Sequence, residues 1–289
     1  MSSERTQWQP DVVIEGAAPP VSDILQAFGL QADTAFPDAS RLNSLASQLY
    51  DGNWRGPDFI DQGSLDPAER RYYEAIIAQD NCVPTREQSW HDLFNALIWL
   101  KFPRSKGLLN RLHMHDINDV GAHPRTPRRN RVTHFDECGV VLAVPASKLS
   151  LANALLSELA DHQWLEAMYT QRSRWEQVIY PVVFGHANLE MLLSPFIGLT
   201  GKWLAVVVPD DYVNSSAVTQ YAMLDAALET RIGQLGNFGQ QHVLKPLPLL
   251  GVPGWHTAQT TTFYGNQEYF RPKRPSTPQT AQLPLTEIT

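Results

Sequence analysis

Histidines paired with other polar side chains at helical spacing are the first candidates for chemistry in this 289-residue chain. His91 and Asn95 are four positions apart, so both would lie on one face of a helix. His186 and Glu190 have the same spacing. Such a His–Glu pair can bind a divalent metal ion, or its carboxylate can orient the imidazole for proton transfer. An ordinary ion pair on a helix surface is the alternative, because the second histidine of an HExxH motif is missing.

A second polar stripe lies on the next predicted helix. Lys106, Asn110 and His113 are spaced by four and three residues, opposite the leucines of that helix. If the two helices pack closely, these side chains converge with His91 and Asn95. The alternative is structural: His91 would bond at the rim of its helix and Asn95 would bond to loop backbone, because buried polar groups usually satisfy other polar groups.

Asp136 and Glu137 are neighbouring acids between two short runs that resemble strands, residues 132–135 and 140–144. The runs predict two strands, with the acids at the turn that joins them. Carboxylates at strand ends can hold Mg²⁺ or Mn²⁺ in phosphoryl-transfer sites. An acidic turn can also be purely structural, because Asp bonds to its own backbone two residues on.

Positive charge is concentrated in residues 101–131, which carry eight Lys or Arg residues against two acids, although the whole chain has a net charge of −7. Arg104 and Lys106 could neutralise the charge of a substrate. Arg128 and Arg129, on a predicted proline-containing loop, could bind the same anion. The alternative is a solvated loop whose positive charges balance an acidic surface nearby.

Apolar periodicity predicts the elements that must position these residues. The helix expected at 90–102 is apolar on almost all sides and should be buried. Pro103 ends it, and a joint of two or three residues leads to the helix that carries Lys106, which predicts a tight helical corner. Other helices are expected at 21–30, 40–50, 66–79, 151–171, 186–193 and 214–235, and strands at 132–135, 140–144, 178–184 and 202–208.

These elements predict an α+β fold, a mostly helical single domain at 21–274 with a small mixed or antiparallel sheet. Residues 1–20 are expected to form a flexible arm and residues 275–289 a flexible tail. Three prolines between residues 245 and 256 exclude a regular helix there. This apolar stretch predicts an extended C-terminal arm that packs on the body through Leu249, Leu250, Val252 and Trp255.

Composition narrows the class of protein. Hydrophobic residues make up 43% and charged residues 18%, which excludes a highly charged disordered chain. No apolar run approaches the roughly 20 residues of a membrane helix, and the N-terminus lacks the pattern of a secretory signal. Two cysteines are too few for a disulfide framework, and the net negative charge argues against nucleic acid as a partner. We expect a cytoplasmic protein without a membrane partner. The sequence does not predict its oligomeric state.

Several stretches of the sequence resemble a bacterial family known as domain of unknown function 3025. They are residues 90–103, 106–113, 133–139, 184–187 with Glu190, and 249–255. Together they span roughly residues 20–272. The resemblance implies a single unit found in cytoplasmic bacterial proteins, and it implies neither an activity nor catalytic residues. Phosphate-binding loops, the GxSxG motif and zinc-finger spacings are absent from the sequence.

The functional hypotheses therefore rest on the chemistry of individual residues. The first is a metal-assisted hydrolase for a phosphate-bearing or otherwise anionic substrate, with Zn, Mg or Mn. Its catalytic groups would be His91, His113, Asp136 and Glu137, its metal ligands His186 and Glu190, and its substrate-binding residues Asn95, Arg104, Lys106, Asn110, Arg128 and Arg129. The second is a non-enzymatic binding protein for a small anionic ligand or a protein partner. The third is a scaffold in which the polar residues only hold helices together.

The metal hypothesis makes a geometric prediction. His91, His186 and at least one of Asp136 and Glu137 must border one cavity, since the donor atoms of a metal site lie about 2.0–2.2 Å from one ion.

Overall fold

The computed structural model of the chain describes residues 8–287 and has an α+β fold. Its helices are α1 (Pro10–Gly16), α2 (Pro19–Ala27), α3 (Ala39–Leu49), α4 (Tyr73–Asp80), α5 (Trp90–Lys101), α6 (Pro103–Val120), α7 (Pro127–Cys138), α8 (Leu149–Ala160), α9 (His186–Leu192), α10 (Ala217–Gln234) and α11 (Thr261–Tyr264). Its strands are β1 (Asp58–Asp61), β2 (Cys82–Thr85), β3 (Gly139–Pro145), β4 (Tyr180–Val183), β5 (Thr200–Val208) and β6 (Lys245–Pro248). None of the described helices is long and apolar enough to cross a bilayer.

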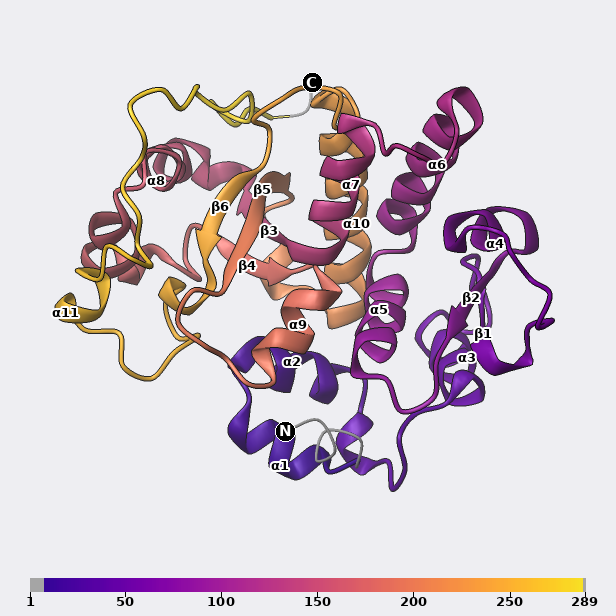
Figure 1. Ribbon diagram of the computed structural model, residues 1–289. Coiled ribbons are helices and arrows are strands. Elements are labelled where there is room, and N and C mark those ends of the chain that lie inside the picture. The colour runs from indigo at the N-terminus through magenta and orange to yellow at the C-terminus, as the bar shows by residue number, and fades with distance from the viewer. Residues whose placement is uncertain (1–7, 288–289) are drawn as a thin grey trace.

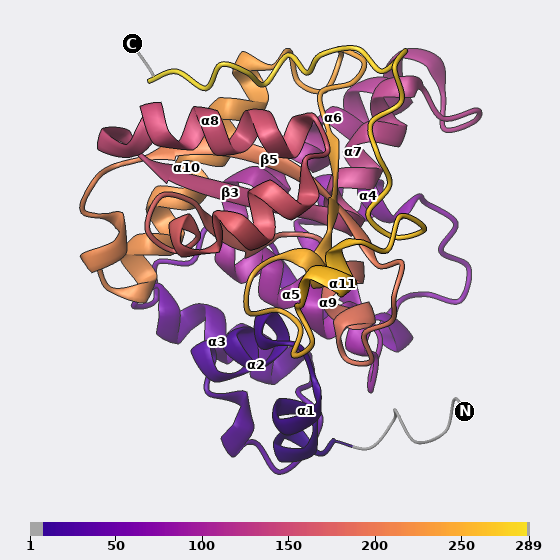
Figure 2. The same ribbon diagram turned by 90° about the vertical axis from the view of Figure 1, so that its left-hand side faces the viewer.

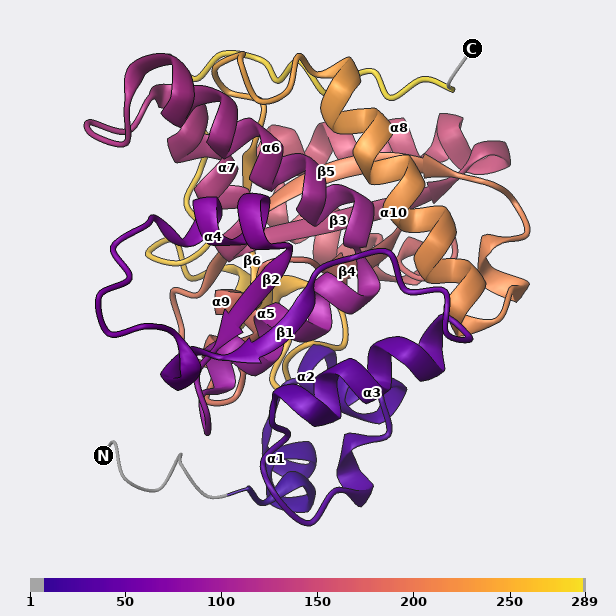
Figure 3. The same ribbon diagram turned by 90° about the vertical axis from the view of Figure 1, so that its right-hand side faces the viewer.

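A four-stranded mixed sheet in the order β4-β3-β5-β6 forms the centre of the fold. β3 and β5 are parallel, with Leu142 opposite Ala205, and both edge strands are antiparallel to their neighbours. Every residue of β3 is buried, because α8 covers one face of the sheet and α7 and α10 cover the other (Figure 1). A separate parallel pair, β1 and β2, lies beside α3 and α4 (Figure 3).

The tight helical corner predicted from the sequence is present between α5 and α6. Ser89 caps α5, with its Oγ accepting a hydrogen bond from the Asp92 amide at 3.2 Å. Phe102 alone separates the two helices, and Pro103 stands at the first position of α6, where its missing N–H removes no helical hydrogen bond. As expected, α5 is buried on nearly all sides.

Residues 127–138 form helix α7, so the strand and turn predicted at 132–137 are wrong. Thr126 caps this helix by accepting a hydrogen bond from the Arg129 amide at 3.0 Å, and Pro127 begins it. Val132 and Phe135 are fully buried on one face of α7. Their β propensity is therefore overridden by the cap and by packing against the sheet. Asp136 and Glu137 consequently lie in the last turn of a helix.

Several other boundaries also differ from the prediction. The helix expected at 66–79 begins at Tyr73, because Asp66 instead closes a turn by accepting a hydrogen bond from the Ala68 amide at 2.8 Å. The helix expected at 151–171 ends as α8 before His162, which has a left-handed φ of 59°, and a π-helical turn follows at Leu165–Thr170. Helix α1 lies in the segment expected to be a flexible arm, of which residues 1–7 are outside the described part.

The C-terminal arm packs on the body as predicted. Residues 245–248 form the edge strand β6, and Leu249, Leu250, Val252 and Trp255 are all buried. The proline-rich sequence is compatible with this position because an edge strand leaves one side of its backbone without ladder bonds.

Residues 275–287 do not form the free tail that we expected. The side chain of Gln282 is fully buried and bonds to the backbone of β5, where the Ala205 amide donates to Gln282 Oε1 at 2.9 Å. The Leu285 amide donates to Asn153 Oδ1 of α8 at 2.7 Å. The C-terminal segment therefore runs against the molecule, along the top of the view in Figure 2.

Candidate functional site

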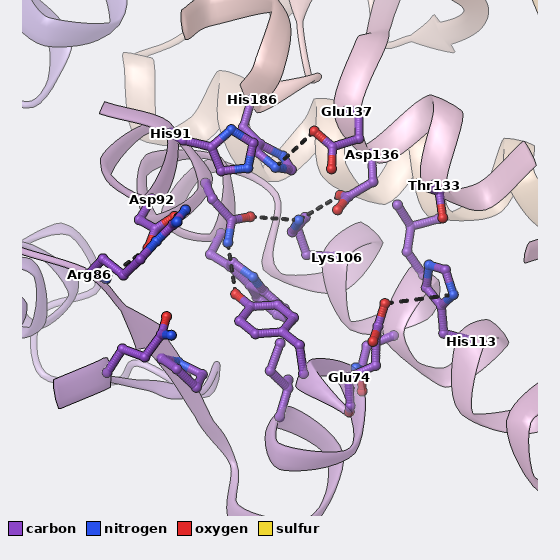
Figure 4. Close-up of a pocket in the computed structure, with 18 of the residues that line it drawn as sticks. Glu74, Arg86, His91, Asp92, Lys106, His113, Thr133, Asp136, Glu137 and His186 are labelled. Atoms are coloured by element: carbon purple, nitrogen blue, oxygen red, sulfur yellow. Dashed lines mark hydrogen bonds and ion pairs between the residues drawn. The ribbon is translucent and has the colours of Figure 1, made fainter. Parts of the chain in front are cut away.

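Five helices surround a pocket with a volume of about 370 Å³, within the usual size range for small-molecule sites. Helix α5 contributes His91 and Asn95, α6 contributes Lys106, Asn110 and His113, α7 contributes Asp136 and Glu137, and α9 contributes His186. Helix α4 adds Tyr73 and Glu74, which the sequence analysis did not single out. The predicted common cavity is therefore present, and Figure 4 shows its side chains.

His91, Glu137 and His186 form a compact triad at one end of this pocket. One potential ligand atom from each residue lies within 4.8 Å of the other two. His186 Nε2 is 3.3 Å from Glu137 Oε2, and the two imidazole rings meet edge to face with their centroids 4.6 Å apart. We call these three residues the His–Glu–His triad.

Gly185 allows the triad to form. It is the N-cap of α9, and a Cβ atom at this position would lie 2.4 Å from the Glu137 carbonyl oxygen and 2.5 Å from the Gly139 amide nitrogen. Any larger residue would push α9 away from the end of α7. The glycine thus brings His186 within reach of Glu137.

Glu190 is not part of the triad, and the prediction that it pairs with His186 is wrong. Its Oε2 lies 2.9 Å from Nδ1 of His91. A proton on His91 Nδ1 that is shared with this carboxylate leaves Nε2 as the free ring nitrogen. Glu190 therefore occupies the place of an outer carboxylate that orients a metal-binding histidine. The i, i+4 spacing could not reveal this, because it places two side chains on one face without saying what faces them.

The protonation state of His186 suits a divalent cation. Burial lowers the pKa of His186 to about 3, with Lys106 and His91 acting in the same direction and Asp136 opposing them. The imidazole is therefore neutral at physiological pH, as a metal ligand must be. Burial and the neighbouring Asp136 carboxylate raise the pKa of Glu137, an effect that a nearby cation would reverse. Two imidazoles and one carboxylate are also a ligand set of catalytic zinc sites.

A chain of hydrogen bonds runs along the wall next to the triad. Lys106 Nζ donates to Asp136 Oδ1 at 2.5 Å and to Asn95 Oδ1 at 2.9 Å, and Asn95 Nδ2 donates to Tyr73 Oη at 2.9 Å. Lys106 is only 4% exposed. Burial by itself would raise the pKa of Asp136, but Lys106, His186 and His113 together outweigh it and leave the pKa below its ordinary value. Lys106 is therefore held in place and already paired with Asp136, so it is not free to move toward a ligand.

The opposite end of the pocket holds His113 and Glu74, as Figure 4 shows. His113 Nδ1 lies 4.0 Å from Glu74 Oε1, and neither this nitrogen nor Glu74 Oε2 has a hydrogen-bond partner among the described residues. Burial lowers the pKa of His113, although Glu74 and Asp136 oppose this. Asn110 does not point its amide at a ligand here, because its Nδ2 donates to the Glu74 carbonyl oxygen at 2.9 Å.

Three arginines expected at the site lie elsewhere. Arg104 bonds to Glu229 of α10 at 2.8 Å, Arg128 pairs with Asp116, and the fully buried Arg129 donates to the Ala122 carbonyl oxygen at 2.6 Å. None of them lines the pocket. The basic stretch is helical there, so its side chains point in several directions and most find partners within the protein.

Two other arginines do line the pocket. Arg125 comes from the basic stretch, and its contacts with Thr133 Oγ1 and Tyr72 Oη are both 3.5 Å long. Arg86 precedes α5 and forms a bidentate ion pair with Asp92, at 2.9 and 2.8 Å. The sequence analysis missed Arg86; its one signal was a position just before the Ser89 cap.

Comparison with known proteins places most of this chain in one family. The sequence model of the family described as protein of unknown function (DUF3025) matches residues 57–274. This range includes the triad, the wall of Lys106 and both arginines of the pocket. Searches of curated proteins and of solved structures found no match.

Proposed function

The chain belongs to the DUF3025 family, and from its site we propose that it is a metal-dependent hydrolase for a small anionic, phosphate-bearing substrate. The observation that carries the proposal is the His–Glu–His triad, with its three potential ligand atoms within 4.8 Å of one another at the edge of a pocket. His91, Glu137 and His186 would hold a divalent ion, and the ligand set favours zinc. The ion would supply Lewis-acid activation of water and of the substrate.

The other residues of the pocket support an anionic substrate. Arg125 has only long contacts, so its guanidinium is available to an anionic group. The buried ammonium of Lys106 also borders the pocket, but Asp136 pairs with it, so Arg125 is the cation that would contact the substrate. His113 has an imidazole pKa lowered by burial, which suits a neutral base that accepts a proton from the reacting groups. Glu190 would orient His91.

Metal analysis and hydrolysis assays test the proposal together. We expect protein purified without chelator to hold about one divalent ion per chain, as a single mononuclear site requires. His186→Gln and Glu137→Gln should abolish binding, whereas Glu190→Gln should weaken it by about 10–100-fold, as loss of an outer-shell partner does. Hydrolysis of nitrophenyl phosphate mono- and diesters, measured with Zn²⁺, Mg²⁺ or Mn²⁺ added, should be abolished in His186→Gln and Glu137→Gln and reduced in Glu190→Gln.

His134→Gln is the matched control, because His134 is exposed on the same helix as Glu137 and lies outside the pocket. It should keep both the metal and the activity. Wild-type protein that stays free of metal after incubation with all three ions would contradict the proposal. So would equal metal binding by wild-type and His186→Gln proteins.

A binding protein for a small anion is the second candidate, and the long contacts of Arg125 favour it. In that case phosphate should raise the melting temperature without any metal, and Arg125→Gln should remove this effect. The hydrolysis assays would then show no turnover with any of the three ions.

A further inference from the structure

A second cavity lies between the edge of the large sheet and the C-terminal segment. Its volume is about 570 Å³, and it shares no lining residue with the first pocket. Strands β5 and β6 contribute Lys202 and Lys245, and the segment after α11 contributes Arg271 and Arg274. We call it the C-terminal cavity. Figure 1 shows the yellow C-terminal segment passing β6 on its way to the top of the molecule.

Four cations line this cavity against a single carboxylate, that of Glu268, although the chain as a whole has a net charge of −7. Within residues 8–287, none of the four forms an ion pair. Lys245 is 3% exposed, and among the described residues its ammonium donates only to the Pro278 carbonyl oxygen, at 2.9 Å. Buried lysines are normally paired with a carboxylate, so this arrangement leaves positive charge uncompensated.

The surroundings of Lys245 add to this imbalance. Burial and the nearby Lys273 lower the pKa of Lys245, while Asp161 opposes them. Asp161 is itself engaged, because Lys273 Nζ donates to its Oδ1 at 2.7 Å. His162 also lines the cavity, and its buried Nε2 has no hydrogen-bond partner among the described residues. The excess positive charge of the cavity therefore comes from its lysines and arginines, because the neutral His162 ring donates from Nδ1 to the Arg271 carbonyl oxygen and keeps an acceptor at Nε2.

The backbone that carries the arginines is held in place. The Arg271 carbonyl oxygen accepts a hydrogen bond from Trp164 Nε1 at 2.8 Å and lies 3.1 Å from His162 Nδ1. Arg271 Nε donates to the Glu268 carbonyl oxygen at 3.0 Å. Fixing this segment before a ligand arrives lowers the entropy cost of binding.

We propose that the C-terminal cavity binds a small molecule with two or more negative charges, carried by phosphate or carboxylate groups. Lys202, Arg271 and Arg274 would contact the anion, and Lys245 would attract it from the buried wall. A cavity of this size on a net negative chain suits a small ligand rather than nucleic acid, which needs an extended positive surface. This inference does not depend on the metal-dependent hydrolase.

Calorimetric titration of chelator-treated protein with inorganic pyrophosphate tests the inference, and citrate in a parallel titration separates phosphate from carboxylate ligands. Lys202→Gln/Arg274→Gln removes two charges from half-buried and exposed positions, so the variant should fold. Its affinity should fall at least tenfold. Arg55→Gln/Lys148→Gln removes the same charge from exposed positions outside both cavities and should bind like the wild type.

Hydrogen exchange supplies a second measurement. Pyrophosphate should slow amide exchange in residues 271–278 of the wild type and leave the Lys202→Gln/Arg274→Gln variant unchanged. Equal weakening in the two double variants would show a general charge effect and overturn the inference. The absence of any measurable binding of both pyrophosphate and citrate would also overturn it.

Discussion

Lys106 is the residue on which the polar wall of the first pocket depends. Its ammonium lies between Asp136 and Asn95 and 5.5 Å from the centroid of the Trp99 ring. The cation is buried and the carboxylate is half-buried, with 23% of its side chain exposed, so each needs the other. Such a pair stabilises the fold weakly in itself, but its disruption leaves a buried charge without a partner.

We therefore expect Lys106→Met to lower the free energy of unfolding by about 3–5 kcal/mol, because Asp136 loses its partner. Lys106→Met/Asp136→Asn removes both charges and should recover at least about 1 kcal/mol of that loss. Urea denaturation of the three proteins measures both values. If the double variant is less stable than Lys106→Met, the ion pair is not the source of the loss.

Gly185 has the corresponding role at the scale of elements, because it sets how closely α9 approaches α7. His186 lies in the first turn of α9, which follows β4, and Glu137 lies in the last turn of α7, which precedes β3. Both strands belong to the same sheet. All the atoms that an added Cβ would meet are backbone atoms, so no rotamer change can relieve the clash.

Gly185→Ala should destabilise the protein by about 1–3 kcal/mol, the usual cost of overpacking, and should weaken metal binding as His186 moves from Glu137. Gly233→Ala in α10 is the control, because no atom lies within 4 Å of its added Cβ. That change should be neutral or stabilise by up to about 1 kcal/mol. Thermal unfolding and metal titration distinguish the two, and unchanged metal affinity in Gly185→Ala would contradict this account of α9.

At the scale of the whole molecule, the C-terminal segment completes the large sheet. The pairing of β6 with β5 extends only as far as Trp203. Beyond this point, the side chain of Gln282 bonds to the backbone of β5 in place of a strand. Its Nε2 donates to the carbonyl oxygens of Trp203 at 3.0 Å and Val243 at 2.6 Å. Arg231 of α10 in turn donates to the Gln282 carbonyl oxygen at 2.6 Å. One residue thus joins a strand, a helix and the end of the chain.

Gln282→Ala should lower the free energy of unfolding by roughly 2–4 kcal/mol, because several buried backbone groups lose their partner. Gln279→Ala, three residues earlier and exposed, should change it by less than about 0.5 kcal/mol. Chemical denaturation of both variants makes the comparison. Similar stabilities would mean that water replaces the side chain of Gln282 without loss.

Local patterns in the sequence by themselves determined the elements whose signals lie within a few residues. Ser89 and Pro103 set the two ends of helix α5, and the apolar composition of this helix predicts that it is buried. The prolines near residue 248 exclude a helix from the C-terminal arm. The spacing rules also identified His91 and His186 as candidates, whereas Glu137 became a candidate as a neighbouring acid at a predicted turn that is in fact the end of a helix. These features are predictable because caps, prolines and periodicity act through neighbouring backbone and the presence of a core.

The tertiary structure alone decided which candidates meet. It turned Glu190 toward His91 instead of His186, and its packing acted together with the Thr126 cap to keep α7 helical against the β propensity of Val132. It also paired Arg128 with Asp116, twelve residues earlier in the chain, instead of leaving Arg128 free for a ligand. The physical reason is that a charged side chain pairs with whatever long-range packing brings opposite it, and helical spacing specifies a face but not its neighbour.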